Sequence, residues 1–191
     1  MAQIIGLNGF ARSGKDTAAH GLAGDGYQRF ALATPIREAM LTLNAILPSG
    51  RRFAELVEHH CGDWDACKAD PVDGAEFRKL QQLFGTEVGR SLLGSSVWID
   101  ILAARIRESG AELVAVSDVR FPNEAEWVHS QGGIVIEIVR PGVVPANGHA
   151  SEQRLPRRLV DHVVLNDGTV EDLHARVRAA VDPAPVLARA A

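Results

Sequence analysis

The sequence predicts a three-layer α/β fold with a mostly parallel central sheet and helices on both of its faces. Short apolar segments alternate with segments of helical periodicity along the whole chain, and no internal repeat is visible. The run "ELVAVSD" at 112–118 is continuously apolar, which is typical of a parallel strand covered on both faces. At 191 residues the chain has the size of one domain that buries roughly 70% of its unfolded surface.

The N-terminal elements are expected in the order strand, loop, helix. Residues 4–7 form a short apolar run that stops at Asn8 and Gly9. The segment "GKDTAAHGLAG" that follows favours a helix and ends in glycine. A second strand is expected at 27–33, "YQRFALA".

The middle of the chain is expected to be helical. Pro35 opens a helix that ends at Pro48-Ser49-Gly50, and residues 50–75 are interpreted as an irregular, partly helical insert. Helices are expected at 76–93 and 97–109. The first of these has an apolar stripe and a polar stripe, and we expect its two glycines to loosen its middle. The apolar stripe is Phe77, Leu80, Phe84 and Val88, the polar stripe is Arg78, Gln82 and Arg90, and the glycines are Gly85 and Gly89.

The last third continues the alternation. After the strand at 112–118, "NEAEWVHSQGG" predicts a helix with a glycine stop and "IVIEIVR" another strand. Residues 141–158 are rich in Pro, Gly, Asn and His up to Pro156, so a mobile lid is expected there. "HVVLNDG" and "TVEDLHARVRAAV" predict the last strand and helix, and residues 182–191 a flexible tail. The domain is therefore expected to span 1–181.

Composition restricts the class of protein. The net charge is -4, which argues against a surface that coats nucleic acid, and no apolar run is long enough to cross a bilayer. The start "MAQIIGLNG" lacks the basic region of a secretion signal, so a cytosolic protein is expected. Cys61 and Cys67 lie near two histidines at a spacing that matches no common zinc site, and reduced thiols are expected.

The stretch "GFARSGKDT" predicts a phosphate-binding loop. Gly9, Gly14 and Lys15 satisfy G-x-x-x-x-G-K between a strand and a helix, where backbone N–H groups and the helix dipole attract an anion. Lys15 supplies a charge for the transferring phosphate, and Thr17 can reach the α-phosphate. The expected nucleotide contacts are Ala11, Arg12, Ser13, Gly14, Lys15, Asp16 and Thr17.

Asp16 stands where a Ser or Thr hydroxyl usually meets magnesium. It either anchors Mg²⁺, directly or through water, or caps the first helical turn, where the helix dipole favours a carboxylate. A residue other than Ser or Thr at this position is more typical of small-molecule kinases than of switch GTPases.

Further motifs carry a family resemblance over nearly the whole chain: "FALATPIREA", "LQQLFGTEVGRSLLGSSVWID", "VSDVRFPNEA", "HASEQ" and "LNDGTVEDL". With the phosphate loop, they resemble the phage deoxynucleoside monophosphate kinases of the P-loop nucleoside monophosphate kinase group. The resemblance implies a P-loop NTPase fold and Mg²⁺-dependent transfer of the ATP γ-phosphate to a deoxynucleoside 5'-monophosphate (dNMP). It also suggests a homodimer in the host cytoplasm, without stable binding to nucleic acid or membrane.

Asp118 and Arg120 follow the most apolar strand, at the sheet edge where open α/β folds bind ligands. Asp118 is expected to orient magnesium-bound water or Arg120, and Arg120 is expected to bind the acceptor phosphate with two hydrogen bonds. The alternative is that Asp118 and Arg120 form an ion pair at the surface. A helical region that binds the acceptor is expected at about 50–95. For each candidate acceptor contact, the alternative is that the side chain is solvated or packs in the core without touching a ligand. The expected acceptor contacts are Arg37, Arg78, Gln82, Arg90, Trp98 and Arg120, with Glu152.

The lid at about 141–158 carries candidate phosphate-binding arginines, and the sequence does not select one. Its polar residues are His149, Ser151, Glu152, Arg154, Arg157 and Arg158. Asn166, Gly168 and Thr169 resemble a loop that contacts adenine, and Thr169 is also a candidate helix N-cap. The competing functions are a phosphomevalonate kinase, a dephospho-coenzyme A kinase and a DNA-associated ATPase.

Overall fold

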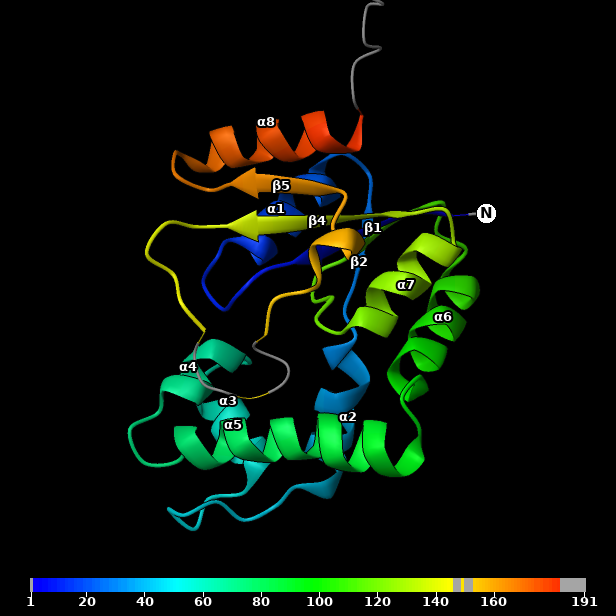
Figure 1. Cartoon of the computed structure of the whole chain (residues 1–191). Coiled ribbons are helices and arrows are strands. Elements are labelled where there is room, and N and C mark those ends of the chain that lie inside the picture. The colour runs from blue at the N-terminus through cyan, green and yellow to red at the C-terminus, as the bar shows by residue number, and fades with distance from the viewer. Residues whose placement is uncertain (1, 146–148, 150–152, 183–191) are drawn as a thin grey trace, which may run out of the picture. The chain divides into compact units, whose positions relative to one another are not determined.

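The computed structural model describes residues 2–145, 149 and 153–182 (Figure 1). It divides the chain into two compact units. The sheet unit comprises Met1–Leu32 and Leu102–Ala191, and the helical unit comprises Ala33–Ile101, with the boundary inside helix α6 (Val97–Ser109). The predicted lid residues Ser151 and Glu152 lie outside the described residues, as does the predicted tail beyond Asp182.

A five-stranded parallel sheet forms the centre of the sheet unit, in the order β2-β3-β1-β4-β5 (Figure 1). Its strands are β1 (Gln3–Asn8), β2 (Gln28–Phe30), β3 (Leu113–Val116), β4 (Ile134–Val139) and β5 (His162–Leu165). Ile5 of the central strand β1 pairs with Ala115 of β3 and with Ile134 of β4. The carboxyl ends of all five strands therefore lie at one edge, and the predicted α/β fold is confirmed.

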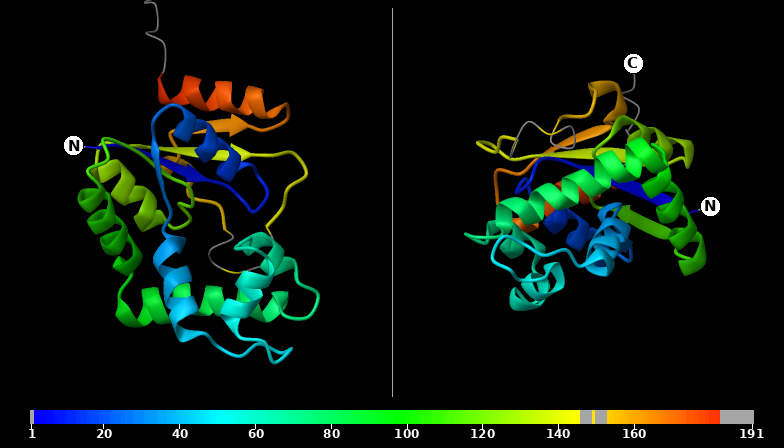
Figure 2. Two further views of the ribbon diagram at one scale, coloured as in Figure 1. Left: turned by 180° about the vertical axis from the view of Figure 1, so that it is seen from behind. Right: turned by 90° about the horizontal axis from the view of Figure 1, so that it is seen from below.

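Helices cover both faces of this sheet (Figures 1 and 2). On one face, Ile5 and Leu7 pack against α1 (Lys15–Gly24) and α8 (Val170–Val181). On the other face, Gly6 lies under Val128 of α7 (Pro122–Ser130), where an added Cβ would come within 3.2 Å. Successive side chains of β1 point to opposite faces of the sheet, and both faces are covered by helices. This is why the strand is apolar at consecutive positions.

The helical unit contains α2 (Ala33–Leu43), α3 (Phe53–His59), α4 (Trp64–Ala69), α5 (Gly74–Leu83) and the π-helix η1 (Phe84–Leu93). Its core is aromatic: the rings of Phe53 and Phe77 stack with centroids 4.3 Å apart, and Trp64 packs against both. The insert at 50–75, expected to be irregular and partly helical, contains the two short helices α3 and α4, so its partial helicity is confirmed. Helix α2 ends at Leu43, earlier than the predicted stop at Pro48.

The helix predicted at 76–93 forms, but its second half has π hydrogen bonding. The glycines in it are packing positions, and that they loosen the middle of the helix stays a prediction. A Cβ on Gly89 would overlap the ring of Trp98, and a Cβ on Gly85 would lie 3.1 Å from Ile36. The indole N–H of Trp98 donates to the carbonyl of Gly85 at 2.7 Å.

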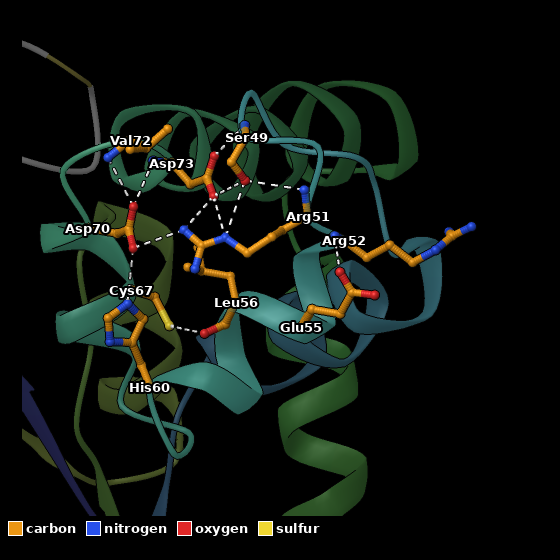
Figure 3. Close-up of polar contacts among 10 residues, drawn as sticks. All are labelled: Ser49, Arg51, Arg52, Glu55, Leu56, His60, Cys67, Asp70, Val72 and Asp73. Atoms are coloured by element: carbon orange, nitrogen blue, oxygen red, sulfur yellow. Dashed lines mark hydrogen bonds and ion pairs between the residues drawn. The ribbon is translucent and has the colours of Figure 1, made fainter.

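A polar cluster around the buried carboxylate of Asp73 links the loop before α3 to the turn before α5 (Figure 3). The carboxylate of Asp73 accepts hydrogen bonds from Ser49 and Arg51, and Arg51 also reaches Asp70 at 3.1 Å. The backbone N–H of Asp73, with other donors, holds the pKa of Asp70 well below its ordinary value. Burial raises the pKa of Asp73, but the hydrogen bonds from Ser49 and Arg51 outweigh this effect and lower it. His60 adds a contact to Asp70 at 3.3 Å.

Among the helices that the structure describes, none combines the length and apolar character needed to cross a bilayer.

Candidate active site

The loop between β1 and α1 has the curled backbone of an anion-binding turn. Three of its residues have positive φ angles: 147° at Gly9, 66° at Arg12 and 100° at Gly14. The N–H of Ser13 donates back to the carbonyl of Phe10 at 3.1 Å, which closes the turn. Gly14 is the N-cap of α1, so the unpaired N–H groups of the helix begin at this loop.

The glycine at position 9 is required by contact as well as by φ. A Cβ there would lie 2.5 Å from Ser13 Oγ and 2.6 Å from the carbonyl oxygen of Ile138. Ser13 itself is 1% exposed, and its hydroxyl has no hydrogen-bond partner among the described residues. A buried hydroxyl without a partner is costly unless a ligand or water satisfies it.

Lys15 and Asp16 begin α1 as an ion pair. Lys15 is 7% exposed and its Nζ lies 3.4 Å from Asp16 Oδ2, whereas the Asp16 side chain is 67% exposed. The lysine is thus held against the protein, and the carboxylate is accessible from solvent. Thr17 follows in the same helical turn and is half-buried.

The carboxyl end of β3 is fastened to that of β1. The N–H of Val119 donates to Leu7 at 3.0 Å, and the Asn8 amide donates to the Val119 carbonyl at 2.7 Å. Asp118 Oδ1 accepts the N–H of Leu32 at 2.7 Å. Asp118 therefore lies at the same sheet edge as the phosphate loop, as its position after the strand predicts. Asn8 was missed, although a polar residue that ends an apolar strand is a usable signal.

Glu124 holds the backbone on either side of the predicted acceptor residue Arg120. Its Oε2 accepts the N–H of Arg120 at 2.7 Å and that of Phe121 at 3.0 Å, and Glu124 is 4% exposed. Sequence reasoning missed this role, but Pro122 followed by a glutamate at the third helical position is a recognisable helix start.

The loop after β5 contacts the phosphate loop. Asn166 Nδ2 donates to the carbonyl of Ser13 at 2.8 Å, and Thr169 caps α8 by accepting the N–H of Asp172, as predicted. Beside this loop is a hollow of about 270 Å³ lined by Arg140, Pro141, Asn166, Asp167 and Gly168. A contact of Asn166, Gly168 or Thr169 with adenine stays a prediction.

Among the three lid arginines, Arg154 reaches the phosphate loop. Its guanidinium carbon lies 5.4 Å from the ring centroid of Phe10, and its Nη1 lies 3.8 Å from Glu137. Arg157 instead donates to the carbonyl of Val160 within its own 3₁₀ turn, η3 (Arg157–Leu159), and Arg158 lies 3.9 Å from Glu126.

The other predicted acceptor residues belong to the helical unit. Arg37 lies over the ring of Trp64 at 5.0 Å, and its Nε is buried without a hydrogen-bond partner among the described residues. Trp98 is 5% exposed, so its ring and N–H are engaged in the core of that unit. The remaining three, Arg78, Gln82 and Arg90, are half-buried on α5 and η1. Glu152 lies outside the described residues.

Comparisons with known proteins point in one direction. The family model described as deoxynucleotide monophosphate kinase matches residues 69–177. A putative deoxynucleotide monophosphate kinase of Acanthamoeba polyphaga mimivirus is 30% identical over 196 residues, covering 95% of this chain and 97% of the relative. The deoxynucleoside-5'-monophosphate kinase of Escherichia phage T5 is 33% identical over 96 residues, 47% of this chain and 38% of the phage protein. The Enterobacteria phage T4 deoxynucleotide monophosphate kinase is 31% identical, over 53% of this chain and 43% of its own length.

Alignment to the two phage enzymes thus spans less than half of their length. Among solved structures, TT1252 from Thermus thermophilus superposes with a TM-score of 0.50 at 20% identity, covering 94% of this chain and 96% of that one. This likeness shows the fold alone. None of these matches favours the phosphomevalonate kinase, dephospho-coenzyme A kinase or DNA-associated ATPase alternatives.

Proposed function

Because the chain belongs to the deoxynucleotide monophosphate kinase family, we propose that it transfers the γ-phosphate of ATP to a deoxynucleoside 5'-monophosphate. An oxygen of the acceptor phosphate attacks the γ-phosphorus, the bond to the β-phosphate oxygen breaks, and ADP and the deoxynucleoside diphosphate leave. The observation that carries the proposal is the Gly9–Gly14 loop, which follows the central strand β1 of a parallel sheet and leads into the N-terminus of α1.

The loop fits the triphosphate of a nucleotide. Its positive φ angles curl the backbone, the helix N-terminus supplies N–H donors, and the hydroxyl of Ser13 has its hydrogen bond still to make. Lys15 provides the charge that stabilises the transferring phosphate, and we propose that Asp16 keeps this lysine oriented until ATP binds. Ala11 to Thr17 remain the proposed triphosphate contacts.

Magnesium is the metal that this donor set would suit. Mg²⁺ prefers oxygen ligands and keeps several waters, so one or two carboxylates beside the phosphates are sufficient. The exposed carboxylate of Asp16 is the proposed protein ligand, direct or through water, and Asp118 is proposed to orient magnesium-bound water or Arg120. In the described part of the chain no cluster of three or more acidic, His or Cys side chains could hold a metal by itself. When bound, Mg²⁺ neutralises charge on the β- and γ-phosphates.

Acceptor binding is proposed for cationic side chains. Arg120 is the proposed bidentate partner of the dNMP phosphate, on a backbone that Glu124 fixes. Arg37, with its buried and unsatisfied Nε, is the strongest candidate of the helical unit. Arg154 is the proposed lid arginine, because it already contacts the phosphate loop through Phe10. The proposed host compartment is the cytoplasm of a phage-infected cell, where ATP and dNMPs are present.

The test is the acceptor dependence of ATP turnover. We expect ADP formation to require dAMP, dCMP, dGMP, dTMP or a modified deoxycytidylate, and not to respond to DNA. Lys15→Ala should lower kcat by about 10²–10³-fold with an unchanged unfolding temperature, because it removes charge stabilisation of the transition state. Lys79→Ala, at an exposed lysine on α5, is the matched control. Turnover that responds to DNA alone would refute the kinase proposal.

A further inference from the structure

The carbonyl of Ser13 is held by a side chain from the other end of the sequence. Asn166, which follows β5, donates its Nδ2–H to this oxygen at 2.8 Å, and 153 positions separate the two residues. Ser13 is 1% exposed and Asn166 is half-buried, so water has only partial access to this hydrogen bond.

The orientation of one peptide unit of the phosphate loop depends on this contact. The carbonyl of Ser13 and the N–H of Gly14 belong to one planar trans peptide and point in opposite directions. An amide that fixes the carbonyl on one side therefore directs the Gly14 N–H to the other side. Gly14 has a φ of 100°, a conformation that glycine adopts at little cost and that other residues rarely adopt.

The Asn166 side chain also occupies the space above Gly14. A Cβ on Gly14 would overlap the Asn166 amide nitrogen and would lie 3.4 Å from Leu173 Cδ2 of α8. The two loops are thus in direct contact, and the asparagine leaves no room for a side chain in the phosphate loop at this point.

Asn166 is itself anchored to the sheet unit. Its own N–H donates to the carbonyl of Val139 at the end of β4, at 2.7 Å. Three residues later, Thr169 and Asp172 form a capping box, in which the N–H of Thr169 donates to Asp172 Oδ2 at 2.9 Å. Because the backbone on both sides of Asn166 is held by hydrogen bonds, its side chain is fixed in place and can restrict the conformation of the phosphate loop that it contacts.

We propose that Asn166 is a positioning residue for the phosphate loop: its amide fixes the Ser13–Gly14 peptide so that the loop N–H groups converge on the triphosphate. This inference rests on the proposed function and deepens it. This role would make residues 166–169, which are expected to contact the base, a component of the phosphate site as well. A change in these residues would then affect phosphate binding through the hydrogen bond from Asn166 to Ser13.

The test uses a ligand that has phosphates and no base. Inorganic tripolyphosphate with Mg²⁺, adenosine, and ATP with Mg²⁺ are titrated separately into wild-type protein, Asn166→Ala and Asn166→Asp. The aspartate has the shape of asparagine but cannot donate to Ser13 in its ionised form. Gln131→Ala, which deletes an exposed amide after α7, is the matched control.

We expect each Asn166 variant to bind tripolyphosphate and ATP more weakly than the wild type, by about tenfold or more and by a similar factor for the two ligands, because a partly buried hydrogen bond is lost. Adenosine binding should change little, and unfolding temperatures report whether each variant is folded. Loss of adenosine and ATP affinity with tripolyphosphate unchanged would overturn the proposal and make Asn166 a base contact. Wild-type protein that binds neither ATP nor tripolyphosphate would refute the proposed function itself, whereas normal binding by both variants refutes only the role of Asn166.

Discussion

Replacing Glu124 by alanine should destabilise the protein and weaken acceptor binding together. Glu124 is 4% exposed, and its Oε2 accepts the backbone N–H groups of Arg120 and Phe121 at 2.7 and 3.0 Å. Hydrogen bonds to a charged acceptor each contribute about 1.5–3 kcal/mol, so the loss of two should cost about 3 kcal/mol or more. In a domain of this size that cost lowers the unfolding temperature by about 6–12 °C.

Glutamine at position 124 should retain much of this stability. One oxygen of Glu124 accepts both N–H groups, and the single carbonyl oxygen of glutamine can take its place. The lost charge weakens both hydrogen bonds to about 0.5–1.5 kcal/mol each, and its absence near the N-terminus of α7 costs about 0.3–1 kcal/mol more. Glu126→Ala, at an exposed glutamate on the same helix, is the control and should behave like the wild type.

The assay combines thermal unfolding with steady-state kinetics. We expect Glu124→Ala to raise the KM for dNMP, because Arg120 loses the support of its backbone, and to leave ATP binding nearly unchanged. An alanine variant that unfolds at the temperature of the Glu126 control and keeps the wild-type KM for dNMP would refute the reasoning.

Three further predictions concern other side chains. Arg120→Ala should lower kcat/KM for dNMP by about 10²-fold with little change in ATP affinity, and Arg120→Lys should recover only part of the loss. If Arg120→Ala instead reduces ATP affinity and leaves the KM for dNMP unchanged, this arginine binds ATP and not the acceptor. Asp16→Ala should raise the magnesium requirement of turnover and Asp16→Ser should restore it, whereas identical magnesium titrations would leave only an electrostatic role at the helix start. The pKa values of Asp70 and Asp73 are lowered in the folded protein, so the stability that they contribute is complete above about pH 4 and is lost as the pH falls below it. Arg51→Ala should therefore unfold at a higher pH than the wild type in an acid titration followed by circular dichroism, and coincident titrations would contradict this role.

The sequence by itself determined the features that are encoded within short segments. Strand and helix periodicity gave the α/β class and helices such as Val97–Ser109 at their observed limits. The phosphate loop could be read because its glycines and Lys15 lie within seven consecutive residues, and the motif set predicted the family that the comparisons confirm. Asp118 could be placed at the ligand edge because it follows a parallel strand directly.

Other features depend on residues that are distant in sequence, and only the tertiary structure decided them. The pattern of 76–93 predicts a helix but not its change to π hydrogen bonding, and it does not predict that Trp98 lies against Gly89. Arg154 was indistinguishable from its neighbours until its contact with Phe10 was seen. Asn166 was predicted to contact adenine, which stays a prediction, and only the structure shows that its amide reaches Ser13 across 153 positions. Periodicity reports the face of an element that is buried, but the partner on that face is set by how the elements pack.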